Sequence, residues 1–246
     1  QLLFRENLSV PYFSRRGLPL NGNEKEQSIP EYIIGSFQKL SDHNKVNLSP
    51  SYYAILLFDG DRMGEWVSGK YLLETNDDSL LAFQERMRTL LLQFSKEASK
   101  YLSGSRGRTI YNGGDDFLGM VNLHSLLEVL NEMHKKFREL VYLKLLNEKE
   151  AYTISDDAPE FTFSAGVAIA HYKEPLKLVL ESAREAEKEA KRSGPDSFSI
   201  SVIRHSGGTT RTVLPFGGSE AITLNALCAT VQALQKGDFS NKFIHQ

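Results

Sequence analysis

The chain of 246 residues is 41% hydrophobic and 24% charged, which is typical of a globular protein with one sizeable core and room for a second small unit. Its net charge of −2 gives no overall basic surface, so nucleic-acid binding by this chain alone is not indicated. A single cysteine, Cys228, excludes a disulfide or a cysteine-based zinc site within the chain. Since no stretch is apolar and long enough to span a membrane and no signal-peptide pattern opens the chain, we expect a cytoplasmic protein.

Residues 1–49 show weak periodicity and many turn-forming residues. Prolines and glycines divide this segment at Pro11, Gly17, Pro19, Gly22 and Pro30. We expect the tail of a preceding domain or an extended arm, with a short helix over 31–40.

Residues 50–206 carry clear periodicities of both helices and strands. The spacing of apolar residues predicts helices over 79–102, 124–147 and 175–192, and strands over 52–58, 108–111, 116–121, 161–170 and 198–203. The resulting order is βαββαβ followed by αβ, which predicts an α+β fold with a ferredoxin-like sheet. Gly166 in the fourth strand indicates that another element approaches its backbone closely.

Residues 207–246 follow a glycine pair. The pattern predicts a loop through Pro215, Phe216 and Gly217, and then a helix over 220–236 that begins a helical domain.

A glycine–aspartate hairpin is the most informative motif. Residues 111–121 read Tyr-Asn-Gly-Gly-Asp-Asp-Phe-Leu-Gly-Met-Val. Gly113 and Gly114 can adopt the positive φ values of a tight turn, and they leave room for a bulky anion near the backbone. Asp115 and Asp116 add paired carboxylates suited to a divalent cation between them and a phosphate. The alternative is an ordinary surface turn, in which glycine and aspartate are common.

A second acidic segment follows the apolar run 52–58, which is typical of a strand buried on both faces. Asp59, Gly60 and Asp61 come directly after it. If the hairpin lies beside this strand, four aspartates share one site, where two Mg²⁺ or Mn²⁺ ions could be held by carboxylates, water and substrate phosphates. Two such ions would activate an attacking hydroxyl and stabilise the leaving oxygen. Taken alone, this segment could also be a solvated turn.

These segments together resemble a known family. The strand ending at Asp59, the hairpin, the Phe-Ser-Ala-Gly strand at 163–166 and the helix ending Ala-Lys-Arg-Ser-Gly at 190–194 resemble the palm of GGDEF-type nucleotidyl cyclases. The stretch 52–66 and the spelling GGDD are more similar to the large subunit of type III CRISPR effector complexes, in particular its Cmr branch. The resemblance covers about residues 50–205.

The resemblance implies an activity. Members of that family convert ATP to cyclic oligoadenylates for antiviral defence when their complex, with its other subunits and crRNA, has bound a target RNA. The 3′-hydroxyl of one nucleotide attacks the α-phosphate of the next, and pyrophosphate leaves. By position, Asp59 matches the strand-end metal ligand, and Asp115 and Asp116 match the catalytic acidic pair, which also binds metal. The resemblance further implies a metal ligand at Asp61 and nucleotide contacts at Gly60, Gly113, Gly114, Ser164 and Lys191.

The sequence departs from the family pattern in several features. The chain has no His-Asp dipeptide of a nuclease domain, no cysteine zinc motif and no second, degenerate palm, so we expect a piece of a larger subunit that turns over ATP poorly in isolation. Gly104 and Gly107 stand where many diguanylate cyclases carry an inhibitory Arg and Asp.

Two alternatives remain open at this point. One is a diguanylate cyclase-like enzyme using GTP, although Arg184 and Lys188 replace the Asp and Tyr typical of that group. The other is a scaffold with a vestigial nucleotide site, which has no reason to keep clustered aspartates. Lys188 and Arg192 also fit a solvated helix face, and His124 and His134 fit a helix surface or edge better than a metal site.

Overall fold

A computed structural model describes residues 10–15, 20–22, 28–31, 51–147, 151–204, 208–217 and 224–236. The chain divides into two compact units, Gln1–Tyr52 and Tyr53–Gln246. The described part of the first unit contains helix α1 (Val10–Arg15) and an antiparallel bridge between Asn21 and Ser28. The helix predicted over 31–40 lies outside the described residues, apart from residue 31.

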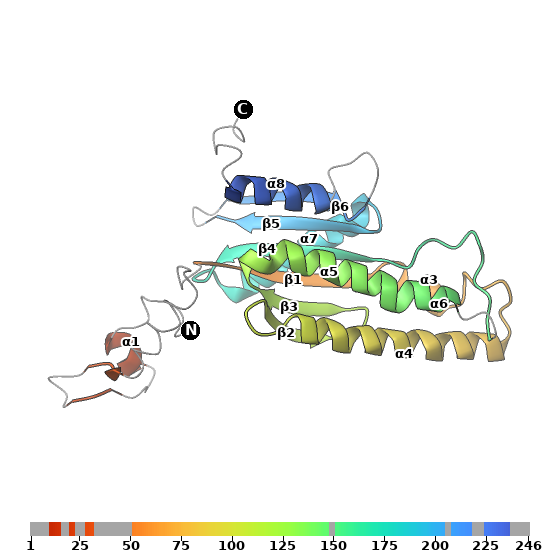
Figure 1. The fold of residues 1–246 in the computed structure, drawn as a ribbon, viewed down its shortest axis with the longest axis horizontal. Coiled ribbons are helices and arrows are strands. Elements are labelled where there is room, and N and C mark those ends of the chain that lie inside the picture. The colour runs from red at the N-terminus through yellow and green to blue at the C-terminus, as the bar shows by residue number, and fades with distance from the viewer. Residues whose placement is uncertain are drawn as a thin grey trace. The chain divides into compact units, whose positions relative to one another are not determined.

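The second unit is built on one six-stranded sheet with the strand order β2-β3-β1-β4-β5-β6 (Figure 1). The strands are β1 (Tyr52–Gly60), β2 (Gly107–Asn112), β3 (Phe117–Val121), β4 (Phe163–His171), β5 (Ser197–Ile203) and β6 (Thr209–Pro215). The main helices are α3 (Met63–Val67), α4 (Asp77–Tyr101), α5 (Leu126–Phe137), α7 (Leu176–Ser193) and α8 (Leu224–Lys236). The predicted α+β, ferredoxin-like order is confirmed.

Strand pairing brings distant segments of the chain together. β3 pairs antiparallel with both β1 and β2, and the register sets Phe58 opposite Phe117, so the β2–β3 hairpin lies beside the end of β1. β4 and β5 are parallel and are joined by α7, as a βαβ crossover requires.

Two predicted elements differ from the structure. Residues 209–215, predicted as a loop, form β6 along the whole length of β5, from Ser197 opposite Pro215 to Ile203 opposite Thr209. This edge strand tolerates the proline because Pro215 stands at its end. The helix predicted over 124–147 keeps its apolar stripe but is divided into a 3₁₀ turn (Leu123–Ser125), α5, a π-helical turn (Arg138–Tyr142) and α6 (Leu143–Asn147).

Alternation along β1 assigns its side chains to the two faces of the sheet. Leu56 and Phe58 belong to the large core cluster formed with α4 and α5, and the Phe58 ring stacks on Phe117 at 4.7 Å between centroids. Ile55 belongs to a smaller cluster with residues of α7, and Leu57 packs against it. Thus α4, α5 and α8 cover one face, and α7 covers the other (Figure 1).

The contact between α7 and β4 depends on Gly166. A Cβ atom at this position would lie 2.2 Å from the carbonyl oxygen of Ala183 and 2.3 Å from the amide nitrogen of Glu187. The close approach predicted at this glycine is therefore confirmed, and the approaching element is α7.

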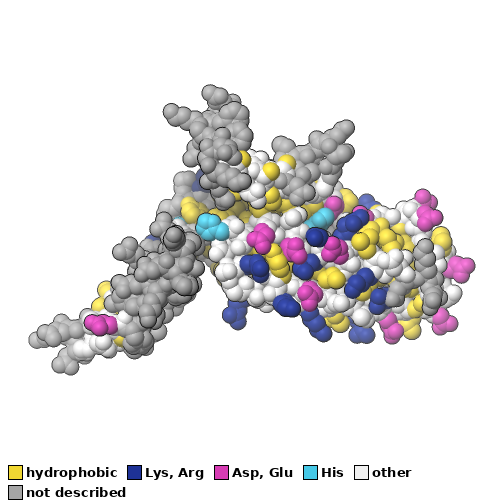
Figure 2. All heavy atoms as spheres, viewed as in Figure 1, with side chains coloured by type: hydrophobic (Ala, Val, Ile, Leu, Met, Phe, Trp, Pro, Cys, Tyr) yellow, Lys and Arg dark blue, Asp and Glu magenta, His cyan; other side chains and the backbone are white. Residues whose placement is uncertain are grey.

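The surface shown in Figure 2 carries basic and acidic side chains interspersed, in line with the small net charge. Within the described ranges, no helix has the length and apolarity needed to cross a bilayer.

Candidate active site

Three segments meet at one edge of the sheet: the end of β1, the β2–β3 hairpin and the start of β4. The amide of Gly60 donates to the carbonyl of Asp115 at 3.1 Å, and the amide of Asp61 donates to the carbonyl of Thr162 at 2.8 Å. The two acidic segments identified in the sequence are thus neighbours in space.

The hairpin is closed by one backbone hydrogen bond and one hydrogen bond to a side chain. The amide of Gly113 donates to the carbonyl of Asp116 at 2.8 Å, and the amide of Gly114 donates to Asn112 Oδ1 at 3.2 Å. Gly114 has a φ of 108° and is buried, and a Cβ there would lie 3.1 Å from the Cβ of Leu91 in α4. The predicted positive φ is confirmed for Gly114 but is wrong for Gly113, which stays outside the left-handed region.

The two hairpin carboxylates lie toward opposite faces of the sheet. Asp115 lies beside residues of α3 and α4, and Asp116 lies beside Leu118 and beside Arg184 and Glu187 of α7. Each carboxylate lines a different pocket. The adjacent pair therefore straddles the edge of the sheet.

The pocket on the α7 side has a volume of about 510 Å³. Asp59 joins Asp116 there, because Asp59 has the parity of Ile55 and Leu57 on β1. The residues lining it are Leu57, Phe58, Asp59, Tyr111, Asp116, Leu118, Arg184 and Glu187.

An ion pair links this pocket to the end of α7. The ammonium of Lys191 donates to Asp59 Oδ2 and lies 3.1 Å from Glu187 Oε1. Burial disfavours the charged ammonium, but the hydrogen bond to Asp59 and the charges of Asp59 and Glu187 outweigh it, so the pKa of Lys191 is raised. Lys191 therefore stays protonated and oriented toward the acidic edge.

For Asp116, the surroundings disfavour the charged form of the side chain. Its pKa is raised first by burial and then by the negative charges of Asp59 and Asp115, and Lys191 and Arg184 offset this only in part. A divalent cation beside these carboxylates would relieve the repulsion.

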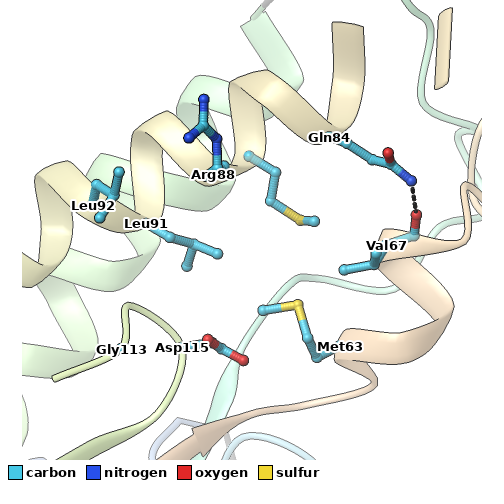
Figure 3. Close-up of a pocket in the computed structure, with 9 residues that line it drawn as sticks. Met63, Val67, Gln84, Arg88, Leu91, Leu92, Gly113 and Asp115 are labelled. Atoms are coloured by element: carbon cyan, nitrogen blue, oxygen red, sulfur yellow. Dashed lines mark hydrogen bonds between the residues drawn. The ribbon is translucent and has the colours of Figure 1, made fainter. Parts of the chain in front are cut away.

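The pocket on the α4 side is apolar and has a volume of about 410 Å³. Figure 3 shows Met63 and Val67 from α3 and Leu91 and Leu92 from α4 around it, with Asp115 at its floor. The remaining lining residues are Gln84, Met87, Arg88 and Gly113. The Gln84 amide donates to the Val67 carbonyl at 2.8 Å, which fixes α3 against α4. An apolar pocket with a few polar groups is typical of a small-molecule binding site.

Asp61, expected as a metal ligand, is occupied by protein donors. Its side chain accepts hydrogen bonds from the hydroxyls of Thr162 and Ser164, both at 2.7 Å, and from the amide of Asp196 at 3.0 Å. Asp61 is only 5% exposed and Ser164, expected to line the nucleotide pocket, is fully buried. A cation or nucleotide could reach Asp61 and Ser164 only by replacing these hydrogen bonds, so their role here is to hold the end of β1 against the starts of β4 and β5.

Sequence reasoning missed Asp196, which lies between α7 and β5. It has a left-handed backbone with φ of 59°, and its carboxylate lies 2.5 Å from Nε2 of His134. The His134 ring stacks on Phe216 at 4.4 Å. His134 is thus a partly buried partner of Asp196 and not a free surface side chain. The Gly-Pro-Asp sequence signals a turn, but no local signal identifies a partner 62 residues away.

The three aspartates at this end of the sheet, Asp59, Asp115 and Asp116, fit a cation that takes its remaining ligands from water and substrate phosphates. Among the described residues, no group of three or more His, Cys, Asp or Glu side chains is arranged to hold a metal ion. Mg²⁺ commonly binds through one or two carboxylates and completes its octahedron with water and substrate phosphates. Asp59, Asp115 and Asp116 supply the right donor chemistry for such a substrate-dependent site.

A ferredoxin-like sheet with a glycine–aspartate hairpin beside a strand-end aspartate defines a palm domain of the cyclase type. The family model described as Cas10/Cmr2, second palm domain, matches residues 52–199, more than half of the chain. The chain therefore belongs to the Cas10/Cmr2 family, the large subunits of type III CRISPR effector complexes.

Individual relatives agree with this assignment. The CRISPR system Cmr subunit Cmr2 of Pyrococcus furiosus is 27% identical over 203 residues, covering 75% of this chain and 21% of that protein. The chain thus spans about a fifth of the length of this relative.

Among solved structures, a type III-B Cmr-beta complex in its apo state matches 84% of this chain and 32% of its own chain, with a TM-score of 0.53 and 14% identity. A Csm1–Csm4 cassette in complex with cA4 matches 62% of this chain and 20% of its own, with a TM-score of 0.42 and 17% identity.

Proposed function

We propose that this palm binds ATP with two divalent cations, Mg²⁺ or Mn²⁺, and forms cyclic oligoadenylates when its type III CRISPR complex holds a target RNA. The observation that carries this proposal is the shared pocket of Asp59 and Asp116, with Asp115 on the other side of the same sheet edge. Other subunits of the complex, crRNA and target RNA are the partners in this proposal.

In this proposal, Asp59, Asp115 and Asp116 hold the cations, which when bound neutralise phosphate charge and activate the attacking 3′-hydroxyl. Lys191 orients Asp59 through their ion pair. Its ammonium can also donate to a phosphate oxygen from the end of α7. Catalysis of this kind depends on positioning and charge neutralisation and needs no covalent nucleophile.

The nucleotide spans the edge of the sheet in the same proposal. Its adenine lies in the apolar pocket between α3 and α4, and its phosphates pass the backbone at Gly113 toward the α7 side. Gly60, expected as a second nucleotide contact, is buried with its amide bonded to the Asp115 carbonyl, so it supports the hairpin instead. The exposed position of Gly113 leaves its backbone accessible for this, whereas Gly114 is buried under Leu91 and shapes the turn.

The electrostatics favour an enzyme over a scaffold. Burial, and then the charges of Asp59 and Asp115, raise the pKa of Asp116, which is an unfavourable arrangement without a bound cation. A purely structural palm gains nothing from such crowding.

The assembled complex provides the test. Replacing Asp115 and Asp116 together by alanine should abolish synthesis of labelled cyclic product from ATP on target RNA. A matched control is Asp156→Ala with Asp157→Ala, since these adjacent aspartates also lie in an exposed turn but line neither pocket. Near-normal synthesis by the hairpin variant, or equal loss in the control, would reject the proposal. Thermal shifts with ATP and GTP, each with Mg²⁺, separate this proposal from a GTP-using cyclase.

A further inference from the structure

Arg184 is a positively charged side chain of the α7-side pocket to which the proposed function assigns no role. Arg184 lines this pocket from α7, together with Asp59, Asp116 and Glu187. Its spacing from Glu187 and Lys191 is three and seven residues, so all three lie on one face of the helix.

The two cations of this face differ in what they contact. Lys191 is engaged by Asp59 and Glu187. Within the part of the chain that the structure describes, the guanidinium of Arg184 forms no hydrogen bond or ion pair, and its side chain is exposed to the pocket. Arg211, by contrast, is fixed by Glu185 and Glu189, both at 3.1 Å.

Arg184 nevertheless acts on Asp116 through space. Its positive charge offsets part of the repulsion at that carboxylate, although no direct contact joins the two. A guanidinium and a carboxylate that face a cavity of about 510 Å³ without meeting leave space for a ligand between them. A cation-bound polyphosphate suits this space, because it presents oxygens to the arginine and its metal ion to the carboxylate.

The spacing along α7 suits an extended anion. Seven helical residues rise by about 10 Å, so Arg184, which lines the pocket, and Lys191, which lies outside its lining and holds Asp59, are separated by about that length along the helix. Glu187 lies between them, but its carboxylate is already held by Lys191. A guanidinium binds two phosphate oxygens at once, which an ammonium cannot do in the same planar geometry.

We propose that Arg184 binds the terminal phosphates of the nucleoside triphosphate and holds them as the pyrophosphate leaving group. This inference rests on the proposed function for the identity of the nucleotide, but the polyphosphate subsite can be tested separately.

The test uses the full-length large subunit and inorganic tripolyphosphate as the probe, measured by calorimetry with and without Mg²⁺. Arg184→Gln should weaken binding by about tenfold or more, as expected for lost hydrogen bonds between charged groups, and Arg184→Lys should restore only part of the affinity. Lys188→Gln is the matched control, because Lys188 is an exposed cation one turn along the same helix and lies outside the pocket. Its affinity should stay within about twofold of wild type, since only screened long-range charge is lost.

Three results would overturn the inference: no tripolyphosphate binding by the wild-type subunit, unchanged binding by Arg184→Gln, or an equal loss in Lys188→Gln. In the assembled complex, Arg184→Gln should raise the KM for ATP by about the same factor as it weakens tripolyphosphate binding. A complex that makes no cyclic product, with tripolyphosphate binding that still depends on Arg184, would reject the proposed function and keep this subsite. If the Arg184→Gln complex makes cyclic product normally with an unchanged KM for ATP, the proposed function stands and the phosphate subsite at Arg184 is rejected.

Discussion

The amide of Asp196 donates a hydrogen bond of 3.0 Å to the buried carboxylate of Asp61, across 135 residues of sequence. Thr162 and Ser164 donate to the same carboxylate, so one side chain ties the end of β1 to the starts of β4 and β5. Since α7 leads directly into Asp196, this anchor also determines where Lys191 meets Asp59. Asp61 thus holds the strands of the site together through buried hydrogen bonds, whereas the side chain of Asp59 lines the α7-side pocket.

This division predicts different behaviour for the two aspartates. Asp61→Asn should destabilise the protein by about 3 kcal/mol, because an amide cannot accept all the hydrogen bonds that the buried carboxylate accepts. Asp59→Asn should cost about 1 kcal/mol or less, since its ion pair with Lys191 is partly exposed, with side-chain exposures of 42% and 31%. Denaturant unfolding measures both values. Asp59→Asn should still lose cyclic product synthesis, and equal stability losses in the two variants would contradict the assignment.

The crowding at Asp116 predicts a pH dependence of stability. Because its folded-state pKa is raised, the folded protein binds this proton more tightly than the unfolded chain does. The resulting stabilisation is complete below the ordinary carboxyl pKa of about 4 and is lost as the pH rises through the folded-state value. Wild type should therefore lose stability relative to Asp116→Asn as the pH rises from about 4 toward neutrality.

Thermal unfolding of both proteins across this pH range gives the comparison. Added Mg²⁺ should reduce the difference at neutral pH, if the cation binds beside the carboxylate. A stability difference that is the same at every pH would show that Asp116 is not electrostatically strained.

Gly166 predicts a strong packing effect. Gly166→Ala should destabilise the protein by about 3 kcal/mol, because the added methyl group would meet backbone atoms of α7 that cannot turn aside as a side chain can. Gly64→Ala is the matched control, since nothing lies within 4 Å of its added Cβ and the residue is in helix α3. The control should be neutral or more stable by up to about 1 kcal/mol. Denaturant unfolding decides, and a mild effect at Gly166 would mean that α7 can move away from β4.

Much of this palm can be predicted from its sequence because its signals are local. The apolar run of β1, the stripe of α4 and the glycine–aspartate turn each depend on residues close in the chain, and the order of the elements then predicts the sheet. Strand β6 escaped prediction because Thr-Thr-Arg-Thr is partly exposed at a sheet edge and lacks an apolar alternation.

The interior of the site was harder to predict because its contacts are long-range. Asp59 and Asp61 look equivalent in the sequence, yet the end of β1 places one in a pocket and the other beneath Ser164 and Thr162. The pairing of His134 with Asp196 depends on where α5 crosses the sheet, which no local pattern contains.

The two pockets at the edge of the sheet predict separable effects on base and phosphate binding. Val67 is 38% exposed and lines the apolar pocket of Figure 3 but not the α7-side pocket, so Val67→Trp should fill the space proposed for adenine without disturbing the core. Affinity for ATP should fall by about tenfold or more, as for other lost buried contacts, while affinity for tripolyphosphate stays unchanged. Leu81→Trp is the control, because Leu81 is an exposed residue of α4 outside the pocket. If Val67→Trp binds ATP normally, the adenine lies elsewhere. If ATP and tripolyphosphate weaken together, the two pockets do not act as separate base and phosphate sites.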